Sequence, residues 1–485
     1  MSQTFYSVSA PAGSGKTYAA ILHSIQLAKN HQKVLIAQPS IALISQTEAD
    51  LLGHNSGVQV TKIISKKGAH SSQSVITRIL AHMRETDPAR GEVLLISQDA
   101  LGRLPDVYRQ AWHLIVDELP KAFAAHKMSI AKSHGFITSH LELTGDLGPT
   151  VPGVKVVEAA NMSALRDLAE NKSKDKAVAL FKDLANDVLN EDKFVCVDEH
   201  AYAELTSGSG KRKEITFYAF QRSEFVRNYA SVTMMGALFD DTEIAHIWSR
   251  LDNVGWKPHP FIGKNLRYQA HQNGFRLTIK YLVEGNWSQS FADKPHNDGT
   301  ILEAVCATME AELGEDFLWQ SNKKHEDSIF DDGIKLPQIV HGINKPKFQK
   351  QHGVALVKAI NHNSGSGAFL KAIGFTTEEL KVTLQYQNEY QAMMRSSLRD
   401  RNATAPVTVC VVSKGSADWL AKHFRNCKVE KLASDLPEPQ GVGAPSKAIT
   451  KSGAERKWDS VEKKRVKNAA AYGNVYVARP WPGAQ

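Results

Sequence analysis

The sequence has few cysteines and no long apolar run, and both features narrow the class of protein. Only four of its 485 residues are cysteines, and no two of them form a Cys-x-x-Cys pair: Cys196, Cys306, Cys410 and Cys427. A disulfide framework or a cysteine zinc site is therefore not expected. No apolar run approaches the ~18–20 residues of a membrane span, and no basic-then-apolar leader opens the sequence. These features predict a cytoplasmic protein with no membrane partner.

The overall composition is that of an ordinary globular chain with an excess of positive charge. Hydrophobic residues make up 42% and charged residues 23% of the sequence, and a chain of this length is expected to form two to four domains. The net charge is +8 and the pI is about 9.0. This balance favours a polyanionic partner such as nucleic acid.

The stretch "APAGSGKT" at 10–17 follows the β-favouring run "FYSV" and precedes apolar residues at helical spacing. A strand, a glycine-rich turn and a helix in this order predict a P-loop, although an ordinary tight turn is an alternative interpretation. Lys16 would reach the β- and γ-phosphates of ATP, and the Thr17 hydroxyl would ligate Mg²⁺. The expected nucleotide-binding residues are Ala12, Gly13, Ser14, Gly15, Lys16 and Thr17.

A second motif, "WHLIVDELP" at 112–120, reads as a buried strand that ends in two adjacent carboxylates. A P-loop ATPase needs an aspartate at the tip of a neighbouring strand to hold Mg²⁺, with a base or water-positioning group beside it. Asp117 fits the first role and Glu118 fits the second. Without the P-loop, the same pair would be read as a solvated turn.

Strands that alternate with helices predict a doubly wound parallel sheet, in which ligands bind at the carboxyl ends of the strands. We expect a first domain over 1–250 with a helical insertion at about 150–215, and a second α/β domain over 251–427. The second domain should contain a helix at 301–313, strands at 353–361 and 407–413, and a long helix at 376–400. A linker and basic tail are expected over 428–485, where residues 451–467 carry seven Lys or Arg against three Asp or Glu.

The ordered motifs resemble those of superfamily 2 helicases, most closely the DEAD/DEAH-like ATPases of bacteria, phages and mobile elements. "APAGSGKT" resembles motif I, "VDELP" motif II, "LIAQPS" motif Ia and "LLISQDAL" motif Ib. In the second half, "FLWQSN", "VHGIN" and "YQAMMRSSLRD" occupy the places of motifs IV, V and VI. The resemblance spans roughly residues 1–425 and implies two RecA-like domains in tandem.

The resemblance also implies roles for residues in both halves of the chain. ATP would bind in the cleft between the domains, with Mg²⁺ held by Thr17 and Asp117. The implied catalytic residues are Lys16, Asp117, Glu118, Gln391, Arg395 and Arg399, with one of the two arginines acting as an arginine finger. The implied nucleic-acid contacts are Gln38, Ser40, Ser97, His341 and Asn344, and DNA is favoured over RNA.

Three departures from the family pattern keep alternatives open. Leu119 and Pro120 complete motif II, "TMMGAL" at 233–238 stands in place of a Ser-Ala-Thr-like motif III, and Arg395 and Arg399 are spaced by four residues instead of three. The leading hypothesis is an ATP-dependent helicase or translocase on DNA. The alternatives are a duplex-DNA translocase that never separates strands and a nucleic-acid-binding protein with a degenerate motor.

Overall fold

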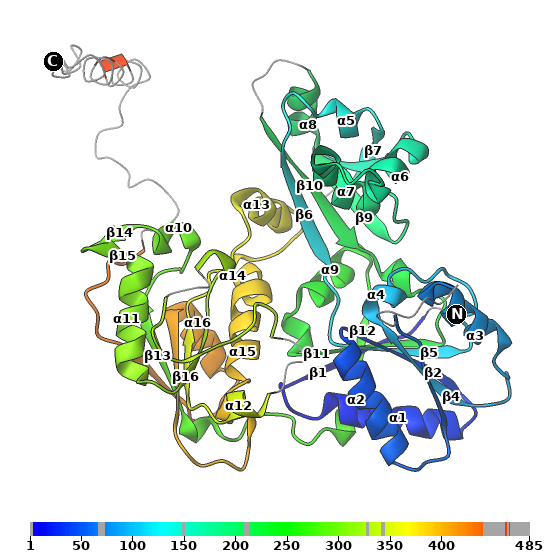
Figure 1. Cartoon of the computed structure of the whole chain (residues 1–485), viewed down its shortest axis with the longest axis horizontal. Coiled ribbons are helices and arrows are strands. Elements are labelled where there is room, and N and C mark those ends of the chain that lie inside the picture. Colours follow the sequence, from blue (N-terminus) through cyan, green and yellow to red (C-terminus); the bar gives the residue numbers. More distant parts are fainter. Residues whose placement is uncertain are drawn as a thin grey trace. The chain divides into compact units, whose positions relative to one another are not determined.

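The structure is a computed structural model that describes residues 3–65, 73–147, 151–207, 213–325, 329–340, 345–439, 461, 462 and 465. The chain divides into two units, Met1–Pro437 and Glu438–Gln485, and the fold below is that of the first unit (Figure 1). The basic tail predicted from the sequence lies almost wholly outside the described residues. No helix in the described part of the chain is long and apolar enough to cross a bilayer.

A seven-stranded sheet forms the first half of the fold, with strand order β12-β1-β11-β5-β2-β4-β3 and every pairing parallel. Its strands are β1 (Phe5–Ala10), β2 (Lys33–Gln38), β3 (Gln59–Lys62), β4 (Glu92–Ser97), β5 (Trp112–Asp117), β11 (Ser231–Ala237) and β12 (Trp256–Pro258). Because β12 belongs to this sheet, the first domain extends past the expected boundary at residue 250.

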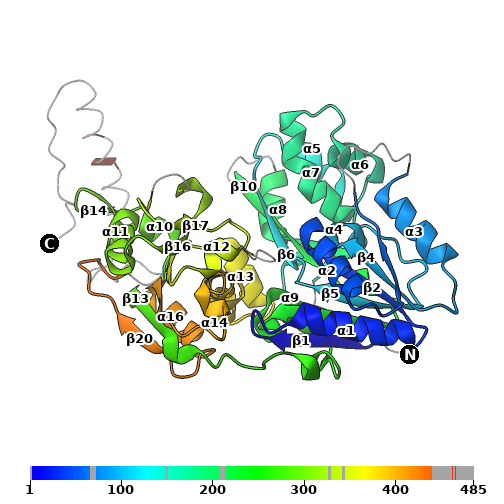
Figure 2. The same cartoon turned by 60° about the horizontal axis from the view of Figure 1, so that its bottom comes forward.

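Helices cover both faces of this sheet, because alternate residues of its central strands are buried on opposite sides. Val34 and Ile36 pack in the core that holds Ile21 of α1, whereas Leu35 and Ala37 pack in the core on the other face. Figure 2 shows α1 lying along the sheet. The helices are α1 (Lys16–Lys29), α2 (Ile41–Gly53), α3 (Val75–Glu85), α4 (Gln98–Leu101) and α9 (Glu243–Leu251). This is the doubly wound arrangement that the sequence predicts.

The sequence predicts a helical insertion, but the segment between β5 and β11 contains strands as well as helices. The strands form a five-stranded antiparallel sheet with order β6-β10-β9-β8-β7. Its strands are β6 (Phe123–Ser129), β7 (Leu141–Asp146), β8 (Val154–Ala159), β9 (Lys193–Asp198) and β10 (Glu214–Gln221). Helices α5 (Gly135–Thr138), α6 (Met162–Glu170), α7 (Lys176–Val188) and α8 (Glu199–Thr206) gather around these strands (Figure 1). The insertion therefore begins soon after Asp117 and Glu118, well before the expected residue 150.

The second half is a six-stranded parallel sheet with order β17-β16-β18-β19-β13-β20. Its strands are β13 (Leu277–Val283), β16 (Phe317–Gln320), β17 (Ile334–Lys335), β18 (Gly353–Leu356), β19 (Val407–Ser413) and β20 (Lys428–Lys431). Around them lie α10 (Gln289–Ala292), α11 (Ile301–Leu313), α12 (Pro346–Gln349), α13 (Ser364–Ala372), α14 (Thr377–Lys381), α15 (Gln387–Met393) and α16 (Lys414–Ala421), with the short ribbon β14 (Pro295–His296) and β15 (Gly299–Thr300). The expected fold of two parallel α/β sheets in tandem is confirmed, and the second sheet includes β20, beyond the expected boundary at 427.

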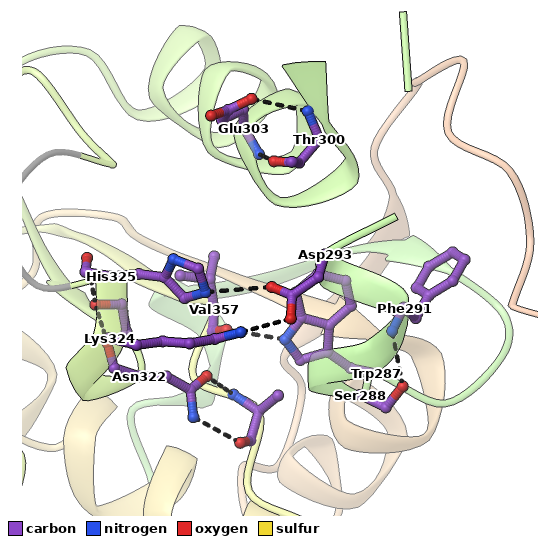
Figure 3. Close-up of polar contacts among 12 residues, drawn as sticks. Trp287, Ser288, Phe291, Asp293, Thr300, Glu303, Asn322, Lys324, His325 and Val357 are labelled. Atoms are coloured by element: carbon purple, nitrogen blue, oxygen red, sulfur yellow. Dashed lines mark hydrogen bonds and ion pairs between the residues drawn. The ribbon is translucent and has the colours of Figure 1, made fainter. Parts of the chain in front are cut away.

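Side-chain hydrogen bonds fix the loops at the carboxyl ends of β13, β16 and β18 (Figure 3). Trp287 Nε1 donates to the carbonyl oxygen of Val357 at 2.8 Å, and Asn322 exchanges two hydrogen bonds of 2.8 Å with the backbone of Ala359. Asp293 pairs with Lys324 and lies 3.4 Å from Nε2 of His325. These bonds connect the loops that follow β13, β16 and β18 to one another.

The segment after β18 packs against the first half of the chain. The ring of Phe369, in α13, stacks on Tyr218 of β10 with a centroid separation of 4.1 Å. Arg250 of α9 pairs with Glu379 at 2.7 Å, and its guanidinium lies 4.5 Å from the ring centroid of Phe375. The first sheet and the root of the insertion therefore share one hydrophobic core with α13 and α14, whereas the strands of the second sheet pack in other clusters.

Candidate functional site

The phosphate-binding loop joins β1 to α1 and has the backbone conformation that its two glycines allow. Gly13 and Gly15 have φ angles of 81° and 83°, in the left-handed region that other residues rarely adopt. A Cβ atom on Gly13 would lie 2.9 Å from Oη of Tyr268, and one on Gly15 would lie 3.1 Å from Cγ of Arg267. Both positions therefore require glycine, as the sequence motif predicts.

Polar groups inside this loop fit a phosphate. Ser14 is fully buried, and its Oγ atom has no hydrogen-bond partner in the described part of the chain. Lys16 Nζ donates to the carbonyl oxygens of Pro11 at 3.0 Å and Ala10 at 3.3 Å, so the ammonium lies over the loop. Burial lowers the pKa of Lys16 to about 8, although Glu118 and Asp117 act against that shift. Bound phosphate would stabilise the protonated amine.

Asp117 lies at the end of β5 and is held as a metal ligand would be. Thr17 Oγ1 and Gln38 Nε2 each donate to Asp117 Oδ2 at 2.9 Å. Burial, and then the charge of Glu118, raise the pKa of the Asp117 carboxyl, while the two hydrogen bonds and Lys16 oppose the rise. A hydroxyl beside a carboxylate is the pair of oxygen ligands expected for Mg²⁺, whose remaining ligands are usually water and phosphate. Thr17 and Asp117 could therefore hold this ion.

Glu118 is the residue next to that carboxylate, and its backbone is strained. Its φ angle is 67°, which is uncommon for a residue with a side chain. Gln98 Nε2 donates to the carbonyl oxygens of Glu118 at 2.6 Å and Asp117 at 3.1 Å. The strained turn after β5 is thus fixed by a side chain from the neighbouring β4–α4 connection.

Two arginines from the second half of the chain face the phosphate-binding loop. Arg395 is buried, and it donates to Gln391 through Nε to the backbone oxygen at 3.0 Å and through Nη2 to Oε1 at 2.9 Å. Burial, reinforced by Arg399, lowers the pKa of Arg395 to about 10, so it stays charged at neutral pH. Cγ of Arg399 lies 3.6 Å from the Cβ position of Gly13. Both arginines act electrostatically on Lys16 and Glu118.

The long helix expected over 376–400 is interrupted, so the two arginines do not lie on one face of a single α-helix. A π-helical turn spans Val382–Tyr386, α15 ends at Met393, and a short 3₁₀ helix covers Ser397–Arg399. Ser396 lies between the two helices, with an extended backbone, and its Oγ caps the 3₁₀ helix by accepting from the amide of Leu398 at 3.3 Å. Arg395 therefore approaches the phosphate-binding loop from the segment that follows α15, and Arg399 approaches it from the 3₁₀ helix.

The sequence predicts Gln38 as a nucleic-acid contact, and the structure corrects this. Gln38 is fully buried at the end of β2, where it also donates to Thr47 Oγ1 at 2.9 Å, so its side chain belongs to the Asp117 site. Ser40 and Ser97 cap α2 and α4 through bonds of 3.2 Å from the amides of Leu43 and Ala100. Their contact with nucleic acid stays a prediction, and His341 and Asn344 lie outside the described residues.

Two residues that the sequence analysis did not single out contact the loop, and a third contacts one of them. Tyr268 and Tyr390 bind the backbone of Ala12, and His271 binds Tyr390. A cavity of about 250 Å³ opens beside them, lined in part by Tyr268, Arg399 and Arg401. Tyr268 and His271 lie in none of the motifs named above, and Tyr390 begins the stretch "YQAMMRSSLRD" without having been assigned a role there.

Part of the chain matches a known protein family, and the matched part includes the phosphate-binding loop. Residues 2–135 match the family model described as DEAD/DEAH box helicase. This part of the chain belongs to that family. The matched segment holds the phosphate-binding loop, Asp117 and Glu118, so the motif I and motif II resemblance is confirmed. No curated protein sequence matches the chain.

Solved structures with similar folds share little sequence with this chain. One described as "XPD_Helicase" has a TM-score of 0.46 and 10% identity, covering 88% of this chain and 96% of its own. Xpd4 of S. tokodaii has a TM-score of 0.42 with the same identity and coverage. Dbp5 of S. cerevisiae, bound to RNA and ADP BeF3, has a TM-score of 0.38 and 10% identity, covering 96% and 89%. The family assignment rests on residues 2–135 and not on these structures.

Proposed function

We propose that the chain is an ATP-dependent nucleic-acid motor that hydrolyses ATP between its two parallel-sheet domains to move along or unwind DNA. The observation that carries the proposal is the meeting of two sets of residues at one loop. Lys16, Thr17 and Asp117 come from the first sheet, while Arg395 and Arg399 approach from the second half of the chain. A site shared by two domains couples phosphate chemistry to their relative motion.

Each residue of the site would have a separate role in the transfer of the γ-phosphoryl group to water. A water molecule attacks the γ-phosphorus, the bond to the β–γ bridging oxygen breaks, and ADP and phosphate are released. Glu118 would orient that water and accept its proton, and Lys16 and the loop amides would hold the β- and γ-phosphates. Arg395 or Arg399 would neutralise the charge that builds on the γ-phosphoryl oxygens. Mg²⁺ on Thr17 and Asp117 would supply charge neutralisation between the phosphates.

The net charge of +8 supports a polyanionic track. Motors of this kind grip phosphates, so binding should depend little on sequence and strongly on salt. The carboxyl ends of the strands, where Ser40 and Ser97 lie, are the expected surface for that grip.

Steady-state ATP hydrolysis tests the proposal, measured alone and with single-stranded DNA, duplex DNA or RNA. Strong stimulation by single-stranded DNA, lost in Glu118→Gln, supports a motor on DNA. Stimulation by duplex DNA without unwinding of a forked substrate favours the duplex translocase. A rate that no polymer changes contradicts the motor and favours a binding protein with a degenerate motor.

A further inference from the structure

Two tyrosine hydroxyls hold the backbone of Ala12, directly before the first glycine of the phosphate-binding loop. Tyr390 Oη accepts a hydrogen bond from the amide of Ala12 at 2.8 Å. Tyr268 Oη donates to the carbonyl oxygen of the same residue, also at 2.8 Å. Ala12 itself is buried. Both polar groups of this residue are therefore bonded to side chains from outside the first sheet.

The Tyr390 hydroxyl is itself fixed by a third group. His271 Nε2 lies 2.8 Å from Tyr390 Oη, and the imidazole stacks on Phe424 with a centroid distance of 4.3 Å and an interplanar angle of 10°. Burial lowers the pKa of His271 to about 4, and burial also raises the pKa of Tyr390. Both groups are neutral at neutral pH, so a phenol and an imidazole share a hydrogen bond whose geometry does not change with the usual assay pH.

The Tyr390 hydroxyl lies in α15, and Arg395, which approaches the phosphate-binding loop, follows two residues after the end of this helix. Tyr390 precedes Gln391 in α15, and Gln391 holds Arg395 through two hydrogen bonds of 2.9 and 3.0 Å. A displacement of Tyr390 from Ala12 would therefore move the Arg395 guanidinium relative to Lys16 and Glu118. Hydrolysis is sensitive to such movement, since a misplacement of about 1 Å can cost on the order of 10²-fold in rate.

We propose that Tyr390 is a positioning residue, which seats α15 on the phosphate-binding loop through the Ala12 amide so that Arg395 acts at the γ-phosphate. The inference rests on the proposed ATP hydrolysis and adds to it Tyr390, the first residue of the stretch "YQAMMRSSLRD", to which the sequence analysis assigns no role. Tyr390 acts through Arg395 and does not itself touch the reacting atoms. Its hydroxyl should therefore matter for the rate of hydrolysis more than for ATP affinity.

The test is Tyr390→Phe, which keeps the buried ring and removes only the hydroxyl. We expect kcat for ATP hydrolysis to fall about 10-fold, as loss of one hydrogen bond can cause, while the dissociation constant for ATP changes less than about two-fold. Tyr386→Phe is the matched control. Tyr386 lies one turn earlier, its hydroxyl is beside Gly415 and its ring packs on Trp419, away from the phosphate-binding loop. Its kcat should match that of the wild type.

A second pair of variants separates positioning from a general loss of structure. If Tyr390 acts through Arg395, then Tyr390→Phe should have little further effect in an Arg395→Ala background. A full 10-fold effect in that background would overturn the proposal, as would equal kcat values for Tyr390→Phe and Tyr386→Phe. All rates are compared at a temperature at which circular dichroism shows each variant folded.

The outcome for the wild type keeps this inference distinct from the proposed function. Wild-type hydrolysis that Tyr390→Phe leaves unchanged overturns the positioning role alone. Absence of hydrolysis in the wild type overturns both proposals together.

Discussion

Replacing Gln38 with leucine should damage the Asp117 site and not a nucleic-acid surface. Gln38 Nε2 donates at 2.9 Å to the Asp117 carboxylate and at 2.9 Å to the Thr47 hydroxyl, and all three residues are buried. A hydrogen bond to a charged group contributes about 1.5–3 kcal/mol and a neutral one about 0.5–1.5 kcal/mol. Leucine also removes Gln38 Oε1, a buried acceptor without a partner among the described residues, and this offsets part of the loss. We expect Gln38→Leu to lower the free energy of unfolding by about 1–3 kcal/mol.

The loss should depend on pH, because Gln38 stabilises the ionised form of Asp117. Burial already raises the folded-state pKa of Asp117 above its unfolded value, so this group makes folding less favourable as pH rises through the folded pKa. Removing the Gln38 bond raises that pKa further. The stability deficit of Gln38→Leu should therefore grow as pH rises, and urea unfolding between about pH 5 and pH 8 measures it.

Gln320→Leu is the control for this experiment. Gln320 is also a fully buried glutamine at a strand end, but its side chain bonds to the carbonyl oxygen of Pro337 at 2.9 Å and to Asn388 at 2.7 Å. Gln320→Leu should lower the free energy of unfolding by an amount that does not change with pH. An unchanged stability in Gln38→Leu, together with weaker binding of single-stranded DNA, would refute the reasoning and restore Gln38 as a nucleic-acid contact.

Two further predictions concern the loop and the packing between the halves of the chain. Gly13→Ala should abolish ATP binding in a fluorescent-nucleotide titration, because φ is 81° and the new Cβ would lie 2.9 Å from Tyr268 Oη; normal binding would contradict the loop geometry. Arg250→Ala should lower the free energy of unfolding by about 1 kcal/mol, since it removes a partly exposed ion pair with Glu379 and a contact with Phe375. The loss should shrink in high salt, whereas Arg103→Ala, which breaks an exposed pair with Asp99, should leave stability unchanged.

Local pattern was sufficient to predict the first half of the site. The run from β1 through Gly13 and Gly15 into α1, and the buried strand that ends at Asp117, each carry their signal within a few neighbouring residues. The helix at Ile301–Leu313 and the strand at Val407–Ser413 match their predicted bounds for the same reason.

Tertiary contacts decide the features that the sequence did not predict. Tyr390 and Ala12 are 378 positions apart, so the sequence around either residue does not predict the hydrogen bond between them. The strands of the insertion are short and partly exposed, as in Leu141–Asp146. Charged residues occur within and between them, and this pattern is also typical of an exposed helix. Gln38 looked like an exposed residue at a strand end, and only the position of Asp117 on the neighbouring strand shows that it is buried.

The central claim is that one ATP site is built jointly by both halves of the chain. Its most direct test measures ATP affinity and single-stranded-DNA-stimulated hydrolysis in Lys16→Ala and Arg395→Ala. We predict that Lys16→Ala loses both, and that Arg395→Ala binds ATP within a few-fold of the wild type but hydrolyses it about 10³-fold more slowly, as for loss of an arginine finger. Hydrolysis at the wild-type rate by Arg395→Ala would contradict a shared site.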